Sequence, residues 1–283
     1  MPHRLFLCVV AYLCCLTLAA QHQVVDSLSR VPIPFATVIV EHTQYGTVAD
    51  AEGRFILPTA ADTGWLNVSA VGYATRRVRL TELNNLPFIT LAPGSYELTQ
   101  VNVAATEFTR RKTVGGVPKS EKLICQFLHG QPGEQIGRRF DLGREALAKS
   151  ASISVVATNA DPVRCRLKFY PVAEDDSISH VAVAHADVFF IIDEAQVYDI
   201  DLSDFDIILP ERVVMVVELV SEPQRGRYIH FGGALFKPNA VYRPHTLAGW
   251  SEGSTSSQEG KRGLVTLAPG FALTILHEGG ARR

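Results

Sequence analysis

The chain has 283 residues, and its 27 lysines and arginines are nearly balanced by 29 aspartates and glutamates, which gives a formal net charge of −2. This balance leaves no basic excess and argues against a nucleic-acid-binding protein. The length exceeds the roughly 100–150 residues of a common domain, so two modules are expected.

The first residues have the pattern of an export signal. Arg4 supplies a positive charge, the uncharged apolar run Leu5–Leu18 follows, and small residues precede the first polar position. The run is shorter than the roughly 20 residues that span a bilayer comfortably. We expect a signal peptide over residues 1–20 with cleavage after Ala20 or Gln21. The mature chain would then be exported to the periplasm, the outer-membrane surface or the medium, without a transmembrane segment; a retained membrane anchor and a lipidated cysteine are the alternatives.

Of the five cysteines, only Cys125 and Cys165 remain after this cleavage. An oxidising compartment permits one disulfide between them. Both lie in strand-like runs, so two separately buried thiols are the alternative. Neither has a second cysteine at the Cys-x-x-Cys spacing of redox and zinc motifs.

Alternation of apolar and polar residues dominates the chain and predicts β-strands throughout. Early in the chain, Pro32 and Pro34 fix an extended entry into a β-branched strand, and Asp50–Gly53 has the residues of a tight turn. Short strands with turn signals every roughly 8–12 residues predict a β-sandwich. The strands expected here are 36–41, 46–49, 54–57, 65–71, 75–80 and 88–91.

Four spaced motifs stand out in this part, namely Val24–Asp26, Pro32–Val38, Gly46–Phe55 and Val68–Tyr73. Together they resemble the carboxypeptidase-like regulatory domain family over residues 22 to about 92. The resemblance implies a seven-stranded, prealbumin-like Greek-key sandwich, which we expect to occupy residues 22–104. It also implies an accessory module without catalytic equipment, of the kind attached to metallocarboxypeptidases, outer-membrane receptors and uncharacterised exported proteins.

The next segment, Tyr96–Val103, resembles the strand that follows this module in TonB-dependent outer-membrane receptors. Only about 180 residues remain beyond it. A barrel of about 22 strands cannot fit into that length, so we do not expect a complete transporter. Residues 105–121 are polar and basic and contain two adjacent glycines and a proline, which predicts a linker.

The remaining part, residues 122–278, is again rich in strand-like runs, and only Arg144–Lys149 hints at a helical turn. Its pattern predicts a jelly-roll-like β-sandwich. It also resembles, less specifically, the companion domain that follows the regulatory module in exported proteins, on the segments Gln135–Gly137, Val163–Pro171, Asp199–Ser203 and Val213–Leu219. The expected strands are 122–128, 135–142, 152–158, 163–170, 185–192, 195–202, 213–220, 228–231, 263–267 and 271–276.

A zinc carboxypeptidase needs two histidines and a glutamate on one metal ion, and a second glutamate as general base. The nine histidines are scattered, without His-x-x-Glu or His-Glu-x-x-His spacing. The regulatory resemblance therefore brings no peptidase activity with it. His185 stands alone in a predicted strand, which favours a structural role. We expect no serine-hydrolase or nucleotide-binding motif, so the sequence argues against an enzyme without deciding the question.

The densest group of carboxylates contains Asp199, Asp201, Asp204 and Asp206. Alternate residues of a strand share a face, so the first two could converge while the others arrive across a turn. Ordinary surface carboxylates are the favoured interpretation. A calcium site, which would be the chain's one cofactor, and a pair of glycosidase carboxylates are the alternatives.

Three aromatic residues, Trp250, Tyr242 and Tyr228, are candidates for binding a ligand, because aromatic rings beside polar groups on a sandwich rim can stack on sugars. Packing back on the sandwich is their alternative role. The leading hypothesis is a non-catalytic exported envelope protein that acts in binding or surface assembly, with a glycan or an outer-membrane or other envelope protein as partner. A glycan or peptide hydrolase acting through the second module and a calcium-stabilised structural module are the alternatives.

Overall fold

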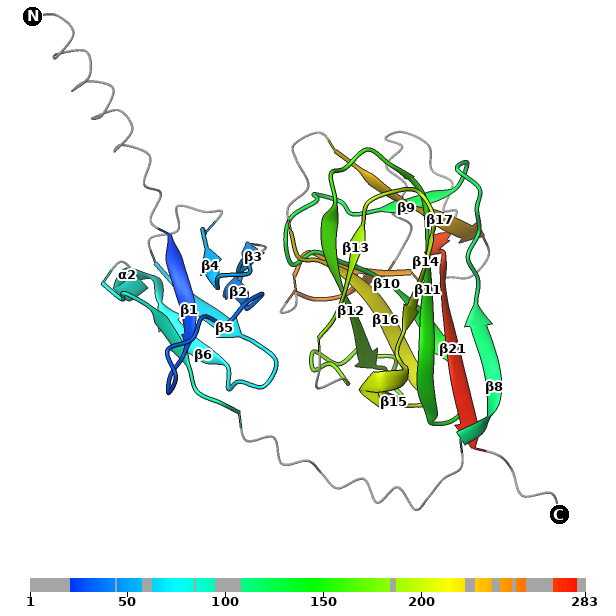
Figure 1. The fold of residues 1–283 in the computed structure, drawn as a ribbon, viewed down its shortest axis with the longest axis horizontal. Coiled ribbons are helices and arrows are strands. Elements are labelled where there is room, and N and C mark those ends of the chain that lie inside the picture. The colour runs from blue at the N-terminus through cyan, green and yellow to red at the C-terminus, as the bar shows by residue number, and fades with distance from the viewer. Residues whose placement is uncertain are drawn as a thin grey trace, which may run out of the picture.

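The computed structural model describes residues 21–43, 45–57, 63–83, 85–94, 108–183, 187–221, 227–235, 240–245, 248–252 and 267–278. These residues form two β-sheet modules that lie side by side, with the N-terminal one on the left of Figure 1. The predicted signal peptide over 1–20, the segment Tyr96–Val103 and His185 lie outside the described residues. No helix in the described part is long and apolar enough to cross a bilayer.

The first module is a sandwich of two sheets. One has the order β4-β1-β7, with β1 and β7 parallel, and the other has the antiparallel order β3-β2-β5-β6. These strands confirm the predicted sandwich. Its elements are β1 (His22–Asp26), β2 (Thr37–Val40), β3 (Gly46–Val48), β4 (Arg54–Phe55), β5 (Trp65–Ser69), β6 (Arg76–Arg79), the short helix α2 (Leu80–Leu83) and β7 (Ile89–Leu91).

The turn between β3 and β4 forms as the sequence predicts. The Oδ1 atom of Asp50 accepts hydrogen bonds from the amides of Glu52 (2.9 Å) and Arg54 (2.7 Å). Gly53 has a φ of 70°, and a Cβ atom there would lie 2.7 Å from the carbonyl oxygen of Val24. Only glycine fits such a position. The turn carries the chain from one sheet to the other, so β3 and β4 lie on the same side of the module, facing the second module (Figure 1).

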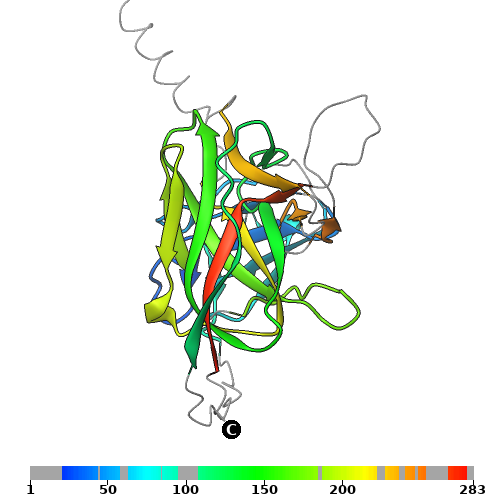
Figure 2. The ribbon, with the colours of Figure 1, turned by 90° about the vertical axis from the view of Figure 1, so that its right-hand side faces the viewer.

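The second module is a larger sandwich. One sheet has the order β13-β12-β16-β10-β18-β19, and the other has the order β20-β17-β11-β21-β8, with β14 and β15 pairing with β11 and β9 pairing with β17. Figure 2 looks towards this second sheet, where β21 (red) lies beside β11 (green). All-β sandwich architecture is therefore confirmed here too.

The elements of the second module are β8 (Phe108–Gly115), β9 (Ile124–Gln126), β10 (Gln135–Asp141), β11 (Ala146–Thr158), β12 (Val163–Pro171), β13 (Val188–Ile192), β14 (Val197–Asp201), the 3₁₀ turn η1 (Ser203–Phe205), β15 (Ile208–Leu209), β16 (Arg212–Leu219), β17 (Ile229–Leu235), β18 (Ala240–Arg243), β19 (Ser251–Glu252), β20 (Leu267–Pro269) and β21 (Phe271–Glu278).

β16 is buried on both of its faces. Met215 and Val217 belong to the main core between the two sheets, whereas Val214 and Val216 belong to a smaller cluster on the outer face of the six-stranded sheet. All four side chains are fully buried. An apolar run without alternation is typical of a strand covered on both sides. The outer face of this sheet is therefore not a simple solvent face.

Two expectations about this module are wrong. Residues 108–115 form β8, an edge strand that pairs with β21, although they lie within the segment 105–121 that we expected to be a linker. An edge strand with basic side chains has the same polar composition as a linker, because charge protects the edge from further pairing. The helical turn suggested by Arg144–Lys149 does not form either, since β11 begins at Ala146.

Candidate functional site

β2 joins the two modules, because both of its faces are buried. Val38 and Val40 belong to the core of the first module. Thr37 and Ile39 are 5% and 2% exposed, although they lie outside that core. Alternate strand residues point to opposite faces, so Thr37 and Ile39 share the outer face. The second module covers this face.

Arg166, on β12, is the polar centre of the contact. Its Nη1 atom donates a hydrogen bond to the carbonyl oxygen of Phe35 (3.3 Å), and its Nη2 atom donates to the hydroxyl of Thr37 (3.1 Å). Within its own module, its Nε atom donates to Glu218 (2.6 Å) and its Nη1 atom pairs with Asp187 (3.2 Å). A buried guanidinium is thus satisfied by both modules together.

Glu218 is fully buried beside Arg166. The Nζ atom of Lys168 lies 3.1 Å from its Oε2 atom, and Gln135 donates a hydrogen bond of 2.9 Å to its Oε1 atom. Burial pushes the pKa of Glu218 upward, but the attraction of Arg166 and Lys168 and the hydrogen bonds outweigh burial and lower that pKa to about 2. Burial likewise opposes the charge of Arg166, but Glu218 and Asp187 raise its pKa. Both groups are ionised at neutral pH.

Two further contacts hold the modules together. The ring centroids of Phe35 and Phe189 lie 4.8 Å apart. Farther along the interface, the Nε2 atom of His245 donates a hydrogen bond of 2.9 Å to the carbonyl oxygen of Thr43. Burial, with a smaller contribution from the nearby Arg243 cation, lowers the pKa of His245. Burial thus favours the neutral imidazole, while the hydrogen bond to Thr43 opposes this shift.

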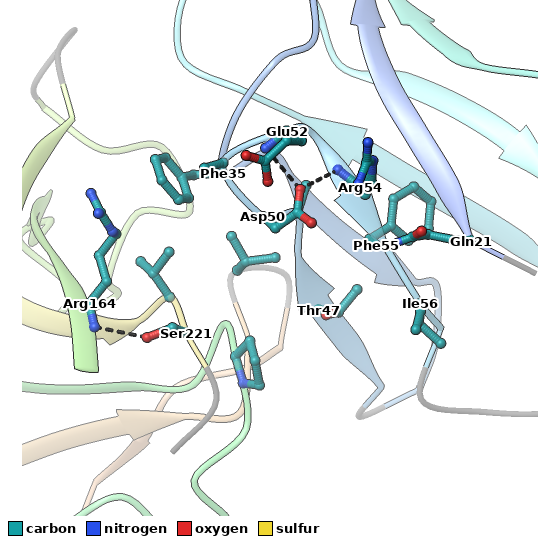
Figure 3. Close-up of a pocket in the computed structure, with 15 residues that line it drawn as sticks. Gln21, Phe35, Thr47, Asp50, Glu52, Arg54, Phe55, Ile56, Arg164 and Ser221 are labelled. Atoms are coloured by element: carbon teal, nitrogen blue, oxygen red, sulfur yellow. Dashed lines mark hydrogen bonds between the residues drawn. The ribbon is translucent and has the colours of Figure 1, made fainter. Parts of the chain in front are cut away.

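A cavity of about 520 Å³ lies beside this contact and takes its walls from both modules (Figure 3). β3, β4 and the turn between them form one wall, and β12, the end of β16 and the loop before β10 form the other. The volume falls within the range of about 300–1,000 Å³ that is common for ligand sites. The lining residues are Gln21, Phe35, residues 47–52 and 54–56, Pro132, Arg164, Val220 and Ser221.

Arg164 lines this cavity from the same face of β12 as Arg166. Its backbone is fixed, because its amide donates to the hydroxyl of Ser221 (2.8 Å) and its carbonyl oxygen accepts from the amide of Val220 (3.0 Å). Its Cζ atom lies 4.9 Å from the ring centroid of Phe35, over the ring. Within the described part of the chain, Arg164 forms no ion pair. Its guanidinium is therefore oriented without being neutralised.

Glu134 holds the loop that carries Pro132 into the cavity wall. It is 1% exposed, and its carboxylate accepts hydrogen bonds from the amides of Leu128, His129 and Gln131. The hydroxyl of Tyr242 donates a further hydrogen bond of 2.7 Å. Four donors on one buried carboxylate fix the loop before any ligand arrives.

A second cavity, of about 630 Å³, lies at the His245 end of the interface. Its acidic lining residue, Glu41, accepts hydrogen bonds from Asn67 (2.7 Å) and from the Nε atom of Arg77 (2.7 Å). This carboxylate is already paired with Arg77. Among its described lining residues, the second cavity therefore offers a ligand no unpaired charge comparable to Arg164 in the first cavity. Its lining residues are residues 39–43, Asn67, Pro244, His245, Ala248, Gly249 and Ser251.

Comparison with known proteins addresses the first module. The model of the CarboxypepD_reg-like domain family matches residues 22–103. The first module is a CarboxypepD_reg-like domain. This confirms the family that the motifs in β1 to β5 resemble. No curated protein matches the chain.

Two solved structures of one surface protein from Clostridium difficile resemble the chain, with low sequence identity and a low TM-score. The cysteine protease and lectin-like domains of Cwp84, a surface layer associated protein, give a TM-score of 0.37 and 8% identity over 82% of this chain and 46% of that one. The same clostridial protease after propeptide cleavage gives a TM-score of 0.37 and 9% identity over 82% of this chain and 51% of that one. The chain thus spans about half the length of these structures.

The three aromatic candidates do not form one exposed surface beside the CarboxypepD_reg-like domain. Tyr242 is 7% exposed and bonded to Glu134. The ring of Trp250 packs against Arg243, whose Cζ atom lies 3.9 Å from its centroid. Tyr228 is 41% exposed but lies at the start of β17, in the other sheet, stacked on His230 at 4.3 Å. Binding of a ligand by all three together therefore has no geometric support.

The predicted carboxylate cluster does not assemble either. Asp199 accepts a hydrogen bond of 2.5 Å from Ser152. Asp201 accepts one of 2.9 Å from the amide of Ser203, which lowers its pKa. No three His, Cys, Asp or Glu side chains in the described ranges, which include Asp204 and Asp206, lie close enough together to hold a metal ion. Asp199 thus acts in a strand pair and Asp201 in a local turn, and calcium binding stays a prediction.

Cys125 and Cys165 are separate buried thiols rather than a disulfide. They lie on different sheets, because Cys125 belongs to β9 and Cys165 to β12, and both point into the main core of the second sandwich. Burial, reinforced by the nearby Glu218 carboxylate, raises the pKa of the Cys165 thiol. The alternative that the sequence left open is the one that forms.

Sequence reasoning overlooked two features of the site and one spaced motif elsewhere. Glu218 is a single acidic residue within the apolar strand β16, a pattern that signals a buried cationic partner. Arg164 and Arg166 alternate on β12 and so share one face.

Contrary to expectation, Gly249, Ser251 and Gly253 have Gly-x-Ser-x-Gly spacing. A nucleophile elbow is a turn from a strand into a helix, whereas Ser251 lies within β19.

Proposed function

We propose that this chain is a non-catalytic exported protein of the cell envelope, acting in binding or surface assembly. Its partner occupies the cavity between the CarboxypepD_reg-like domain and the second sandwich. The observation that carries the proposal is a cavity of about 520 Å³ with walls from both parts of the chain. A ligand in it would contact the β3–β4 wall on one side and Arg164 and Ser221 on the other.

The order of the site before binding supports this function. Arg166 links the two walls through Phe35 and Thr37, and Glu134 fixes the loop at Pro132. Binding at such a site requires little further ordering of the chain, and this favours affinity.

An envelope location is supported by the N-terminal sequence. The apolar run Leu5–Leu18 follows a basic residue and ends in small residues, as in secretory signals. A CarboxypepD_reg-like domain suits an accessory role, in which the domain presents or stabilises a binding surface rather than performing chemistry. The partner is a component that an exported protein meets, such as an envelope protein or a surface glycan.

The experiment uses the mature chain, residues 21–283, tested for capture of cross-linked components of envelope extract and for binding on a glycan array. Ala51→Trp fills the cavity from an exposed turn position that lines it. Ala173→Trp is the matched control, because Ala173 is also exposed but lies in a turn of the second sandwich away from the cavity. We expect the wild type and Ala173→Trp to retain a partner that Ala51→Trp loses.

The proposal fails if envelope extract and array both give no partner, and turnover of a glycan or peptide substrate would then favour a hydrolase. Capture that Ala51→Trp leaves unchanged would place the binding surface elsewhere and contradict the role of the cavity.

A further inference from the structure

The cavity runs along an open sheet edge of the CarboxypepD_reg-like domain. β3 is the end strand of the order β3-β2-β5-β6 among the described residues, and residues 47–49 line the cavity. β4 also borders the cavity, but its edge is closed by the turn. The amide of Asp50 donates to the carbonyl oxygen of Arg54 (2.8 Å), and the amide of Arg54 donates to the Asp50 carboxylate (2.7 Å). β3 is therefore the edge available to a partner.

The hydrogen-bond pattern shows which groups β3 presents. The amide of Ala49 bonds to Ala36 (2.8 Å), and the carbonyl oxygen of Tyr45 accepts from Val40 (3.0 Å). In an antiparallel pair, residues that bond to the partner strand alternate with residues whose backbone groups point away from it. The N–H and C=O groups of Val48 therefore point away from β2, towards the open edge.

The aromatic rings of the cavity are already covered, which argues against a stacked sugar. Phe35 is packed against Phe189 at 4.8 Å and beneath Arg164 at 4.9 Å. Phe55 is 3% exposed, and the ring of His22 lies 5.5 Å from it. Neither phenyl ring presents the open face that a pyranose needs. The lining thus combines a backbone edge, apolar side chains and charged groups rather than an aromatic platform. The charged groups are Arg164, Arg54 and Glu52, together with Asp50, whose carboxylate is already bonded to the amides of its own turn.

The apolar and charged parts of the lining fit an extended peptide. Ile56 is 52% exposed, and it lines the cavity together with Val48 and Val220. Arg164 is held over Phe35 without an ion pair in the described chain. A guanidinium fixed in this way is suited to bidentate hydrogen bonding with a carboxylate. In an extended peptide, alternate side chains could reach the apolar patch and the guanidinium in turn.

We propose that the cavity binds an extended acidic peptide segment of an envelope protein, which adds as a strand to β3 and pairs a carboxylate with Arg164. This inference rests on the proposed function and names the class of partner. Main-chain hydrogen bonds to the edge give affinity in this mode of recognition, and the side-chain subsites give specificity.

The test selects a phage-displayed library of random peptides on the full mature chain. Enriched sequences are then synthesised and measured by fluorescence anisotropy. We expect Asp or Glu beside alternating β-branched residues. Arg164→Met keeps the apolar stem over Phe35 and should weaken binding about tenfold or more. Arg111→Met, which removes the same charge from the exposed strand β8, should change affinity less than about twofold.

Two changes to the peptide test the inference without altering the protein. Replacing its acidic residue by the amide should reproduce the loss seen with Arg164→Met. N-methylation of successive backbone amides should abolish binding at every second position only, because alternate amides of an added strand face β3. Equal binding by Arg164→Met, or uniform tolerance of N-methylation, would overturn the inference.

The remaining outcomes separate this inference from the proposed function. If Ala51→Trp loses an envelope partner but no acidic peptide is selected, the peptide inference fails and the binding function stands. If the array instead shows binding of an acidic glycan that depends on Arg164, the peptide inference again fails and the binding function again stands. If no partner of any class is found, both fail.

Discussion

The Nη2 atom of Arg166 donates a hydrogen bond of 3.1 Å to the hydroxyl of Thr37, so a side chain of the second sandwich is satisfied by the CarboxypepD_reg-like domain. Arg166 is 1% exposed and Thr37 is 5% exposed. Separation of the two modules would therefore remove a hydrogen-bond partner from Arg166, which is ion-paired with the buried Glu218. The contact makes the stability of the second sandwich depend on its neighbour.

Arg166→Met should lower the free energy of unfolding by about 3–5 kcal/mol, because the buried Glu218 carboxylate loses its closest cation. Urea denaturation followed by tryptophan fluorescence measures this change. Thr37→Val is the matched control, since it removes one hydrogen bond and should cost about 1 kcal/mol. A loss for Arg166→Met no larger than that for Thr37→Val would contradict the role of Arg166.

The strand pattern of the fold could be predicted because it is local. The Asp50–Gly53 turn and the alternation in β5 and β12 follow from residues close in the chain, and the motifs in β1 to β5 indicated the right family. The sequence also contains a weak signal of the interface in β2. Thr37–Val40 is buried at every position, and its mostly apolar composition is that of a strand covered on both faces.

The candidate site could not be predicted in the same way, because it is built from residues far apart in the chain. Arg166 and Thr37 are 129 positions apart, and Tyr242 and Glu134 are 108 apart. Composition suggested Trp250 and Tyr242 as a surface for ligands. It could not show that the buried Arg243 packs on Trp250. Nor could it show that the hydroxyl of Tyr242 donates a hydrogen bond to Glu134, which holds the loop before β10.

Glu134→Gln should lower the free energy of unfolding by about 2–3 kcal/mol, because an amide nitrogen would replace one of the acceptor oxygens among several N–H donors. Tyr242→Phe removes one hydrogen bond from the same carboxylate and should cost about 1 kcal/mol. Urea denaturation measures both changes in the free energy of unfolding. If the two variants lose equal stability, Glu134 does not hold the loop through several amides at once.

The two buried thiols should react slowly in the folded chain. Burial and the Glu218 carboxylate raise the pKa of Cys165, and Cys125 is also fully buried. Labelling of the mature chain with Ellman's reagent should be at least about 100-fold slower in native buffer than in guanidinium chloride, since only the thiolate in an opened state reacts. After unfolding without reductant, both thiols should label. Release of a thiol only after reduction would instead indicate a disulfide.

The folded chain should lose stability on mild acidification. Burial lowers the pKa of His245 from its ordinary value; the hydrogen bond to Thr43 opposes this shift, and Arg243 adds a smaller lowering. The unfolded chain takes up a proton near pH 6.5. Between these two pKa values the unfolded state binds more protons, so the free energy of unfolding falls as the pH drops through this window and is fully restored above it. His22 and His230, whose pKa values burial also lowers, act in the same direction.

His245→Gln isolates the contribution of His245, because the glutamine amide can still donate to the carbonyl oxygen of Thr43 but does not titrate in this range. The melting temperature of the wild type should fall between pH 7.5 and 5.0, and that of His245→Gln should fall less over the same interval. His230→Gln is the control away from the interface, since His230 pairs with β9 and β11 inside the second sandwich. A pH dependence that His245→Gln leaves unchanged would show that protonation of His245 does not limit the stability of the contact.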